Sequence, residues 1–352
     1  MKYFGNIQLK ISILFLLILF SSCEKALMDS VPETDSFAIF DEYSKLVKEK
    51  YAMLEFKDVD ITSLENSLRS QITDQTTENE LFEIIGQITL SLRDGHSSLV
   101  DNIADPTIAA QFDFLEGYSP GIDLEILNGY VDTLNKLYVG ESDIVRLVWG
   151  VLPQNNSIGY IWVPSWNREI SDSEIEQVFS DLKETKGLIF DQRMNTGGDP
   201  ILATKFASYF IDEPLYTGFE RFKTGPEMND FSDSHFTLQP SRNPNTYLKP
   251  VMALTDRNVY SAATTFLYSL DPLERVKTVG QITGGGSGSV ADGFLANGWY
   301  WSLSTSEFID ANGRHLDDGV EPDIPVVLNL DDKTKDEVIE RAIMELVKSF
   351  KN

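Results

Sequence analysis

The stretch VMALTDRNVYSAATTFLYSL, residues 251–270, places a mostly apolar strand, a short polar turn and a helix in immediate succession. Its first six residues are typical of a buried strand, and the helix begins at a serine that small residues follow. The stretch GLIFDQRMNTGGD, residues 187–199, again has a buried strand that runs into a polar, glycine-containing turn. Strands that alternate with helices are typical of a mostly parallel sheet, so these stretches predict an α/β fold.

The same alternation extends from about residue 157 to the end of the chain. Apolar runs predict further strands at residues 158–163, 276–281 and about 299–304. Apolar stripes at helical spacing predict helices over residues 175–182, through 206 and 210, and over about 333–350. Residues 157–352 are therefore interpreted as one α/β domain.

Residues 35–95 are predicted to form a small helical bundle. Apolar residues recur at three- and four-residue steps over residues 37–54, as in an amphipathic helix. Two pairs match the capping box that opens a helix: Thr62 with Glu65, and Thr77 with Glu80. Residues 96–156 are less regular and are interpreted as a connecting region with partial strand and helix. This region is short for an inserted PDZ domain and shows no carboxylate-binding loop.

The first 23 residues are interpreted as a lipoprotein signal peptide. Lys2 and Lys10 precede ten unbroken apolar residues, 11–20, which is the length of a signal-peptide core and too short to span a bilayer. The string LFSSC, which ends at Cys23, resembles a bacterial lipobox, whose cysteine is lipidated. We therefore expect an exported protein, lipid-anchored to the bacterial cell envelope, with a tether over residues 24–34. The alternative is an ordinary signal peptide with a chance cysteine.

The composition excludes several classes of function. A net charge of -26 argues against nucleic acid as a partner, because binding phosphates requires clustered Lys and Arg. The single cysteine rules out an intrachain disulfide, and with three histidines the sequence contains no zinc-ligand spacing. No metal and no cofactor is expected.

Three short segments carry candidate chemistry. Ser261 lies where a strand passes into a helix, whose N-terminal N–H groups could meet a developing oxyanion. The Gly197-Gly198 turn follows another strand of the same sheet and could expose further N–H groups. A serine hydroxyl needs a base, and His96 stands at the end of a predicted helix. Each feature also has a plain structural interpretation, as a helix cap, a loop and a surface histidine.

Four segments together resemble peptidase family S41, which includes the C-terminal processing proteases and the tricorn core protease. They occur in the family's order, over about residues 37–330: LRDGHSSL (92–99), GLIFDQRMNTGGD (187–199), VMALTDRNVYSAATTF (251–266) and DDGVEPDIPV (317–326). The resemblance implies a crotonase/ClpP-like spiral α/β core behind the helical bundle. It also implies a serine-type peptidase that acts on a protein or peptide substrate.

The resemblance implies catalytic roles for individual residues of this sequence. Ser261 falls on the nucleophile, and Ala262 with Gly198 or Gly197 falls on the oxyanion-hole amides. Some members use a lysine base, but Gly286 occupies that position here, which leaves His96 as a tricorn-like base.

Two positions depart from the tricorn-like pattern. Gly95 stands where a serine precedes the histidine, and Asp317 is the nearest counterpart of the acidic group, with Asp318 and Glu321 close by. The alternative function is therefore a catalytically weak or inactive lipoprotein of the same fold that binds peptide or a hydrophobic ligand.

Overall fold

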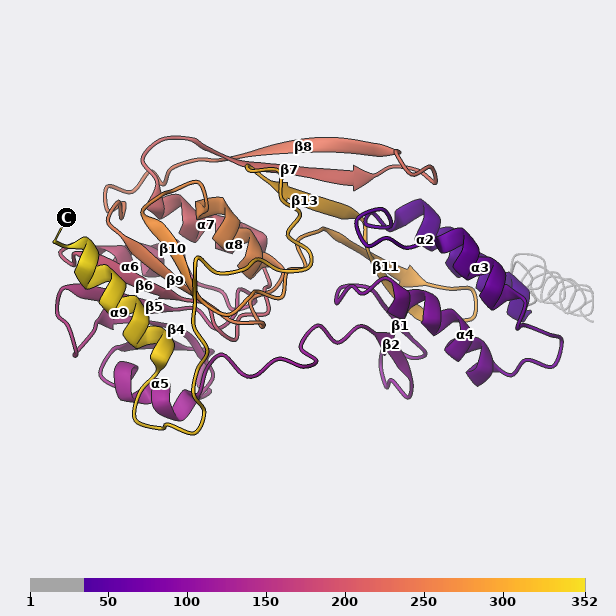
Figure 1. Ribbon diagram of the computed structural model, residues 1–352, viewed down its shortest axis with the longest axis horizontal. Coiled ribbons are helices and arrows are strands. Elements are labelled where there is room, and N and C mark those ends of the chain that lie inside the picture. Colours follow the sequence, from indigo (N-terminus) through magenta and orange to yellow (C-terminus); the bar gives the residue numbers. More distant parts are fainter. Residues whose placement is uncertain (1–34, 352) are drawn as a thin grey trace, which may run out of the picture.

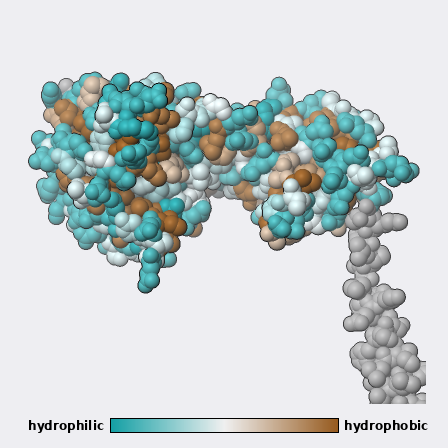
Figure 2. All heavy atoms as spheres, turned by 90° about the horizontal axis from the view of Figure 1, so that it is seen from below, coloured by the Kyte–Doolittle hydropathy of each residue, from teal (hydrophilic) through white to brown (hydrophobic). Residues whose placement is uncertain are grey.

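The computed structural model describes residues 35–351 and shows two lobes joined by a narrower middle (Figures 1 and 2). The predicted signal peptide, Cys23 and the tether lie outside these residues. Among the helices of residues 35–351, none combines the length and apolar character needed to cross a bilayer.

The elements follow one another from the helical lobe into the α/β lobe. The helices are α2 (Ser36–Lys50), α3 (Ile61–Arg69), α4 (Glu78–Ser91), α5 (Leu124–Val131), α6 (Asp172–Leu182), α7 (Pro200–Ala207), α8 (Ala262–Leu270) and α9 (Glu337–Ser349), with a 3-10 turn, η1 (Ser208–Phe210). The strands are β1 (Ser98–Val100), β2 (Ala109–Gln111), β3 (Asn135–Tyr138), β4 (Val145–Val151), β5 (Ile158–Trp162), β6 (Gly187–Asp191), β7 (Leu215–Lys223), β8 (Phe231–Leu238), β9 (Val251–Thr255), β10 (Val276–Gly280), β11 (Val290–Phe294), β12 (Tyr300–Ser304), β13 (Ser306–Asp310) and β14 (Ile324–Pro325).

A seven-stranded sheet forms the centre of the larger lobe. Its order is β14-β10-β9-β6-β5-β4-β3, and the five strands from β14 to β5 run parallel. The strands β5, β6 and β9 are buried along their whole length, as their continuous apolar sequences predict. The predicted α/β core is confirmed.

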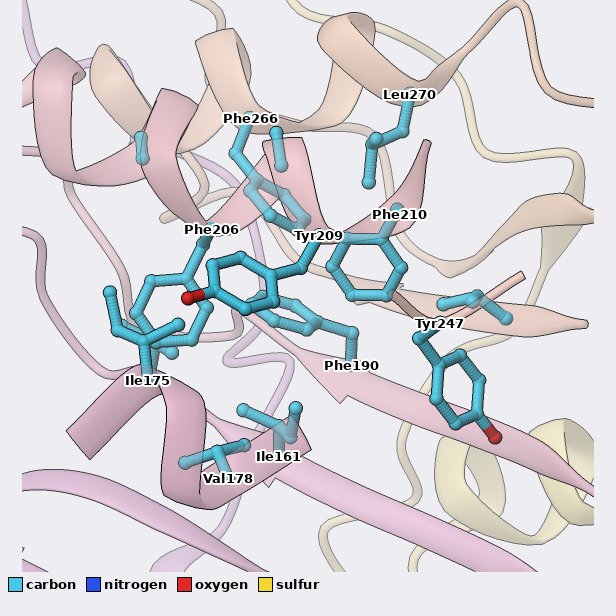
Figure 3. Packing of buried hydrophobic residues seen from close by; sticks show 14 of the residues in the cluster. Ile161, Ile175, Val178, Phe190, Phe206, Tyr209, Phe210, Tyr247, Phe266 and Leu270 are labelled. Carbon is cyan, nitrogen blue, oxygen red and sulfur yellow. The ribbon is translucent and has the colours of Figure 1, made fainter. Parts of the chain in front are cut away.

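Helices cover both faces of this sheet (Figure 1). On one face, α6, α7 and α8 enclose an aromatic core in which Phe190 and Phe266 stack with ring centroids 4.3 Å apart (Figure 3). Phe206 and Phe210 complete this packing from the α7 side. On the other face, α5 and α9 bury a second, aliphatic cluster. Burial of both faces fixes the register of the parallel strands, because a slip of one residue would exchange the two faces.

The smaller lobe packs α2, α3 and α4 against a four-stranded antiparallel sheet of order β11-β12-β1-β2. The capping box of Thr77 and Glu80 is confirmed at the start of α4. The predicted box at Thr62 is wrong, because Asp60 caps α3 by accepting a hydrogen bond from the Ser63 N–H at 3.0 Å, which places Thr62 inside the helix.

The lobes exchange strands that the sequence analysis had assigned elsewhere. The strands β3 and β4 from the connecting region 96–156 extend the main sheet, so the proposed boundary at residue 157 falls within that sheet. Conversely, β11 and β12 come from the C-terminal half and complete the sheet of the helical lobe. The antiparallel sheet β13-β7-β8 extends over the middle of the molecule (Figure 1).

Candidate active site

Ser261 adopts a strained backbone conformation between β9 and α8. Its φ of 55° lies in the left-handed region, which costs a non-glycine residue about 1–3 kcal/mol. The Ser261 N–H donates to the Gly285 carbonyl at 2.9 Å, which helps to hold this geometry. The hydroxyl does not cap α8, and no hydrogen bond within residues 35–351 involves it. The interpretation of Ser261 as a simple helix cap is therefore wrong.

The glycine turn after β6 lies directly against Ser261. The strands β6 and β9 are parallel neighbours, so their carboxyl ends bring the two following turns together. A Cβ at position 197 would lie 2.7 Å from the Ser261 Cβ and 2.8 Å from the Tyr260 carbonyl oxygen. With a φ of 102°, position 197 accepts only glycine without strain or displacement.

Two amides at this junction have no hydrogen-bond acceptor among the described residues: those of Ala262 and Gly198. The Gly197 N–H, in contrast, already donates to the Asn195 side-chain oxygen at 2.9 Å. Ala262 is the first residue of α8, where the helix dipole adds a positive potential. Both unpaired amides border the same cavity as Ser261, so this corner of the cavity can stabilise a negative charge.

A buried ion-pair network holds the start of the glycine turn. The Arg193 side chain is fully buried and binds Asp191 at 2.7 Å and Asp336, from the N-cap of α9, at 2.8 Å. It also donates to the Gly121 carbonyl at 3.0 Å. Removing one member of such a network costs about 3–5 kcal/mol, because a buried charge is left unpaired.

His96 lies in the loop between α4 and β1, with its ring against the edge of Tyr260 at 4.7 Å between centroids. Its Nδ1 is buried and has no hydrogen-bond partner among residues 35–351. Burial lowers the pKa of His96 below its ordinary value, although the Asp94 charge partly opposes this. No hydrogen bond joins His96 to Ser261 within the described chain, so the structure brings the histidine to Tyr260 rather than to the serine hydroxyl.

The Tyr260 side chain lies beside Gly286 and Gly95, the two positions at which glycine stands in place of a side chain of the family pattern. Its ring stacks on Phe114 at 4.2 Å and is buried between loops. A Cβ at Gly286, the position of the family lysine, would lie 2.1 Å from the ring of Tyr260. A Cβ at Gly95, the position of the family serine, would lie 2.9 Å from the Tyr260 hydroxyl. The space that these two side chains would need is already taken.

Asp317 is the buried carboxylate of this region. Its Oδ2 lies 2.6 Å from the Nζ of Lys57, and its Oδ1 is buried and has no hydrogen-bond partner in the part of the chain that the structure describes. Burial, together with the nearby Asp94 charge, raises the pKa of Asp317 to about 7. Asp318 is largely exposed and also pairs with Lys57, and Glu321 is exposed. Among the three acidic residues considered from sequence, Asp317 alone is buried.

Sequence reasoning missed Lys57, which no motif or periodicity marks. It lies between α2 and α3, 3% exposed, and reaches across to the C-terminal segment. The other two histidines make different contacts. The Nδ1 of His235 forms a hydrogen bond with the Tyr216 hydroxyl at 3.0 Å, and the ring of His315 stacks on Phe56 with centroids 4.4 Å apart.

The chain is similar to known proteins in both family and fold. The model of peptidase family S41 matches residues 157–326. A candidate peptidase from Parabacteroides merdae is 30% identical, with a TM-score of 0.80 over 89% of this chain and 97% of its own.

Two more distant structures show a common fold. A photosystem II D1 C-terminal processing protease is 15% identical, with a TM-score of 0.56 over 88% of this chain and 97% of its own. A lipoprotein from Streptococcus agalactiae is 17% identical, with a TM-score of 0.54 over 92% of this chain and 99% of its own.

The close contact between Gly197 and Ser261 can be tested by an alanine substitution with a matched control. Gly197→Ala should lower the free energy of unfolding by about 1–3 kcal/mol more than Gly313→Ala, as measured by urea denaturation. Both glycines have positive φ, 102° and 81°, but a Cβ at Gly313 meets no atom within 4 Å. Equal losses in the two variants would show that the turns are not in close contact.

Proposed function

This chain belongs to peptidase family S41, and from that membership we propose that it is a serine-type peptidase with Ser261 as nucleophile. The observation that carries the proposal is the Ser261 hydroxyl, which is free of any capping bond and borders a cavity with two unpaired amides. The hydroxyl of a structural serine at a helix start normally accepts the capping hydrogen bond from a backbone N–H of the first turn. Strain at a non-glycine residue is also common at functional sites.

In the proposed reaction, the Ser261 Oγ attacks a peptide carbonyl and His96 takes its proton. The N–H groups of Ala262 and Gly198 hold the oxyanion of the tetrahedral intermediate. His96 then protonates the leaving amine, and water repeats the cycle on the acyl-enzyme. No cofactor takes part.

The proposed role of His96 as base rests on its burial and on its Nδ1, which has no hydrogen-bond partner in the described part of the chain. A lowered pKa keeps the imidazole neutral at pH 7, which is the form that accepts a proton. We propose that substrate binding brings the ring to Ser261, since catalytic hydrogen bonds often tighten only in the substrate complex. Asp317 is proposed as the acidic third member, held in place by Lys57.

We also propose that the protein is exported and anchored by a lipid on Cys23. Cys23 is the one cysteine of the chain, and the lipobox-like string ends at it. The structural similarity to a streptococcal lipoprotein is compatible with this location.

Mass spectrometry of the membrane fraction should find a diacylglyceryl cysteine at position 23 as the mature N-terminus. In Cys23→Ser the lipid should be absent, and membrane association should fall with it. A wild-type protein that is recovered without lipid and begins beyond residue 23 would contradict the anchor.

Hydrolysis should depend on Ser261 and His96 as a unit. We expect Ser261→Ala and His96→Ala each to reduce kcat/KM for a peptide library by on the order of 10⁴-fold or more, and the double variant to be little worse. The stability of Ser261→Ala should change by less than about 1 kcal/mol, because its hydroxyl caps nothing. His235→Ala, which removes an imidazole from the β7–β8 hairpin, is the control and should retain activity.

The outcome also separates the two candidate functions. Full activity of Ser261→Ala would refute the assignment of the nucleophile. A wild-type protein that hydrolyses no peptide in the library would favour the binding lipoprotein of the same fold. The specific observation behind that alternative is the missing hydrogen bond between His96 and Ser261 in residues 35–351.

The pH profile should show a histidine base with a lowered pKa. Below that pKa the imidazole is protonated and cannot accept the serine proton, so kcat/KM should fall in acid with a midpoint under the usual 6.5. The pKa of Asp317 is raised to about 7, so this carboxyl could also contribute to the profile. The profile is therefore also measured in Asp317→Asn, in which the fall of kcat/KM with a midpoint under pH 6.5 should persist. A profile that keeps rising above about pH 9 would point to a lysine base instead.

A further inference from the structure

A cavity of about 310 Å³ opens beside Ser261, and its far wall comes from the antiparallel sheet β13-β7-β8 and from α8. Aromatic rings form much of that wall: Phe308 stacks on Tyr268 at 4.1 Å and on Phe236 at 5.9 Å. The amides of Gly198 and Ala262 border the same space. A side chain next to the bond under attack at Ser261 would therefore enter this cavity.

Glu220, from β7, is the one residue with a charged side chain among the residues that line the cavity. The residue is only 8% exposed. Its Oε1 accepts hydrogen bonds from the Ser289 N–H at 3.1 Å, from the Ser289 hydroxyl at 2.6 Å and from the Ser306 hydroxyl. Its Oε2 accepts no hydrogen bond from residues 35–351, and no Lys, Arg or His of this part pairs with the carboxylate.

This arrangement leaves a largely buried carboxylate with half of its acceptor capacity unused. Burying a charge without a counter-ion is costly, whereas the cost is offset when a cation pairs with it. The hydrogen bonds to Oε1 fix the direction of the carboxylate in advance, so a ligand does not have to order it. Apart from Glu220, the residues that line the cavity are uncharged: hydroxyl-bearing, aromatic, aliphatic and glycine residues, so none of them supplies a counter-ion.

We propose that this cavity binds a lysine or arginine side chain of the substrate at a residue flanking the scissile bond, with Glu220 as its counter-ion. The inference rests on the proposed peptidase function and names its substrate class. The aliphatic part of the side chain would lie along Phe236 and Phe308, and the aromatic faces would also favour a cation. A purely apolar side chain would fill the same wall but would leave Oε2 desolvated without a partner. The net charge of -26 further attracts cationic peptides.

The test compares charged side chains with neutral side chains of similar shape. Peptides that differ only in arginine against citrulline, and in lysine against norleucine, are offered to wild type and to Glu220→Gln. Wild type should cleave next to the charged residue with a kcat/KM on the order of 30-fold or more above its neutral counterpart. In Glu220→Gln that preference should disappear while cleavage of the neutral peptides is retained.

Two controls keep the result interpretable. Glutamine retains the Oε1 that accepts from Ser289 and Ser306, so Glu220→Gln should fold, and labelling of Ser261 by a fluorophosphonate checks this. Glu307→Gln removes an equally buried carboxylate from the neighbouring strand, where it pairs with Arg221 at 2.7 Å outside the cavity. Glu307→Gln should keep the preference for basic residues.

Binding is measured as well, so that the inference does not depend on turnover. Nα-acetyl-arginine amide should bind to wild type and not to Glu220→Gln, whereas the citrulline analogue should bind to neither, as followed by calorimetry. Cleavage or binding without preference for the charged partner would overturn the inference and leave the peptidase proposal intact. A wild-type protein that neither cleaves peptides nor reacts with the fluorophosphonate, but still binds the arginine amide through Glu220, would instead overturn the peptidase proposal alone.

Discussion

The candidate site depends on the close approach of two turns that follow neighbouring parallel strands. The glycine turn after β6 and the serine turn after β9 meet where a Cβ at position 197 would lie only 2.7 Å from that of Ser261. Glycine at this position lets the two backbones touch, and the left-handed backbone of Ser261 then aims its hydroxyl away from the helix cap. The buried Arg193 network fixes the glycine turn to β6 and to the start of α9, which supports the contact from its β6 side.

Burial shapes the electrostatics around this contact. His96 and Tyr260 share a largely buried region with Asp94 and Asp317, and Lys57 brings the positive charge that allows a carboxylate there. These groups come from segments far apart in the chain: three precede residue 100, and Tyr260 and Asp317 follow residue 250. Substitutions in the helical lobe can therefore alter the protonation of groups near Ser261, the candidate nucleophile in the other lobe.

Local patterns in the sequence predicted much of the fold and the order of the site segments. A few adjacent residues encode each of the buried strands, the turn at Gly197-Gly198 and the start of α8. The family resemblance then indicated that these segments belong to one site. Side chains that act across lobes left no such signal: Lys57 and the ring of Tyr260 acquire their roles only by tertiary packing. The capping box at Thr62 failed for a local reason, since Asp60 competes as an earlier cap.

The central claim is that Ser261 is a reactive nucleophile rather than a structural serine. The most direct measurement is mass spectrometry of the intact and digested protein after reaction with a fluorophosphonate. The account predicts one adduct per chain, located on the peptide that contains Ser261 and lost when His96 is replaced by alanine. An unmodified protein under conditions that label other serine peptidases, or an adduct on a different residue, would contradict it.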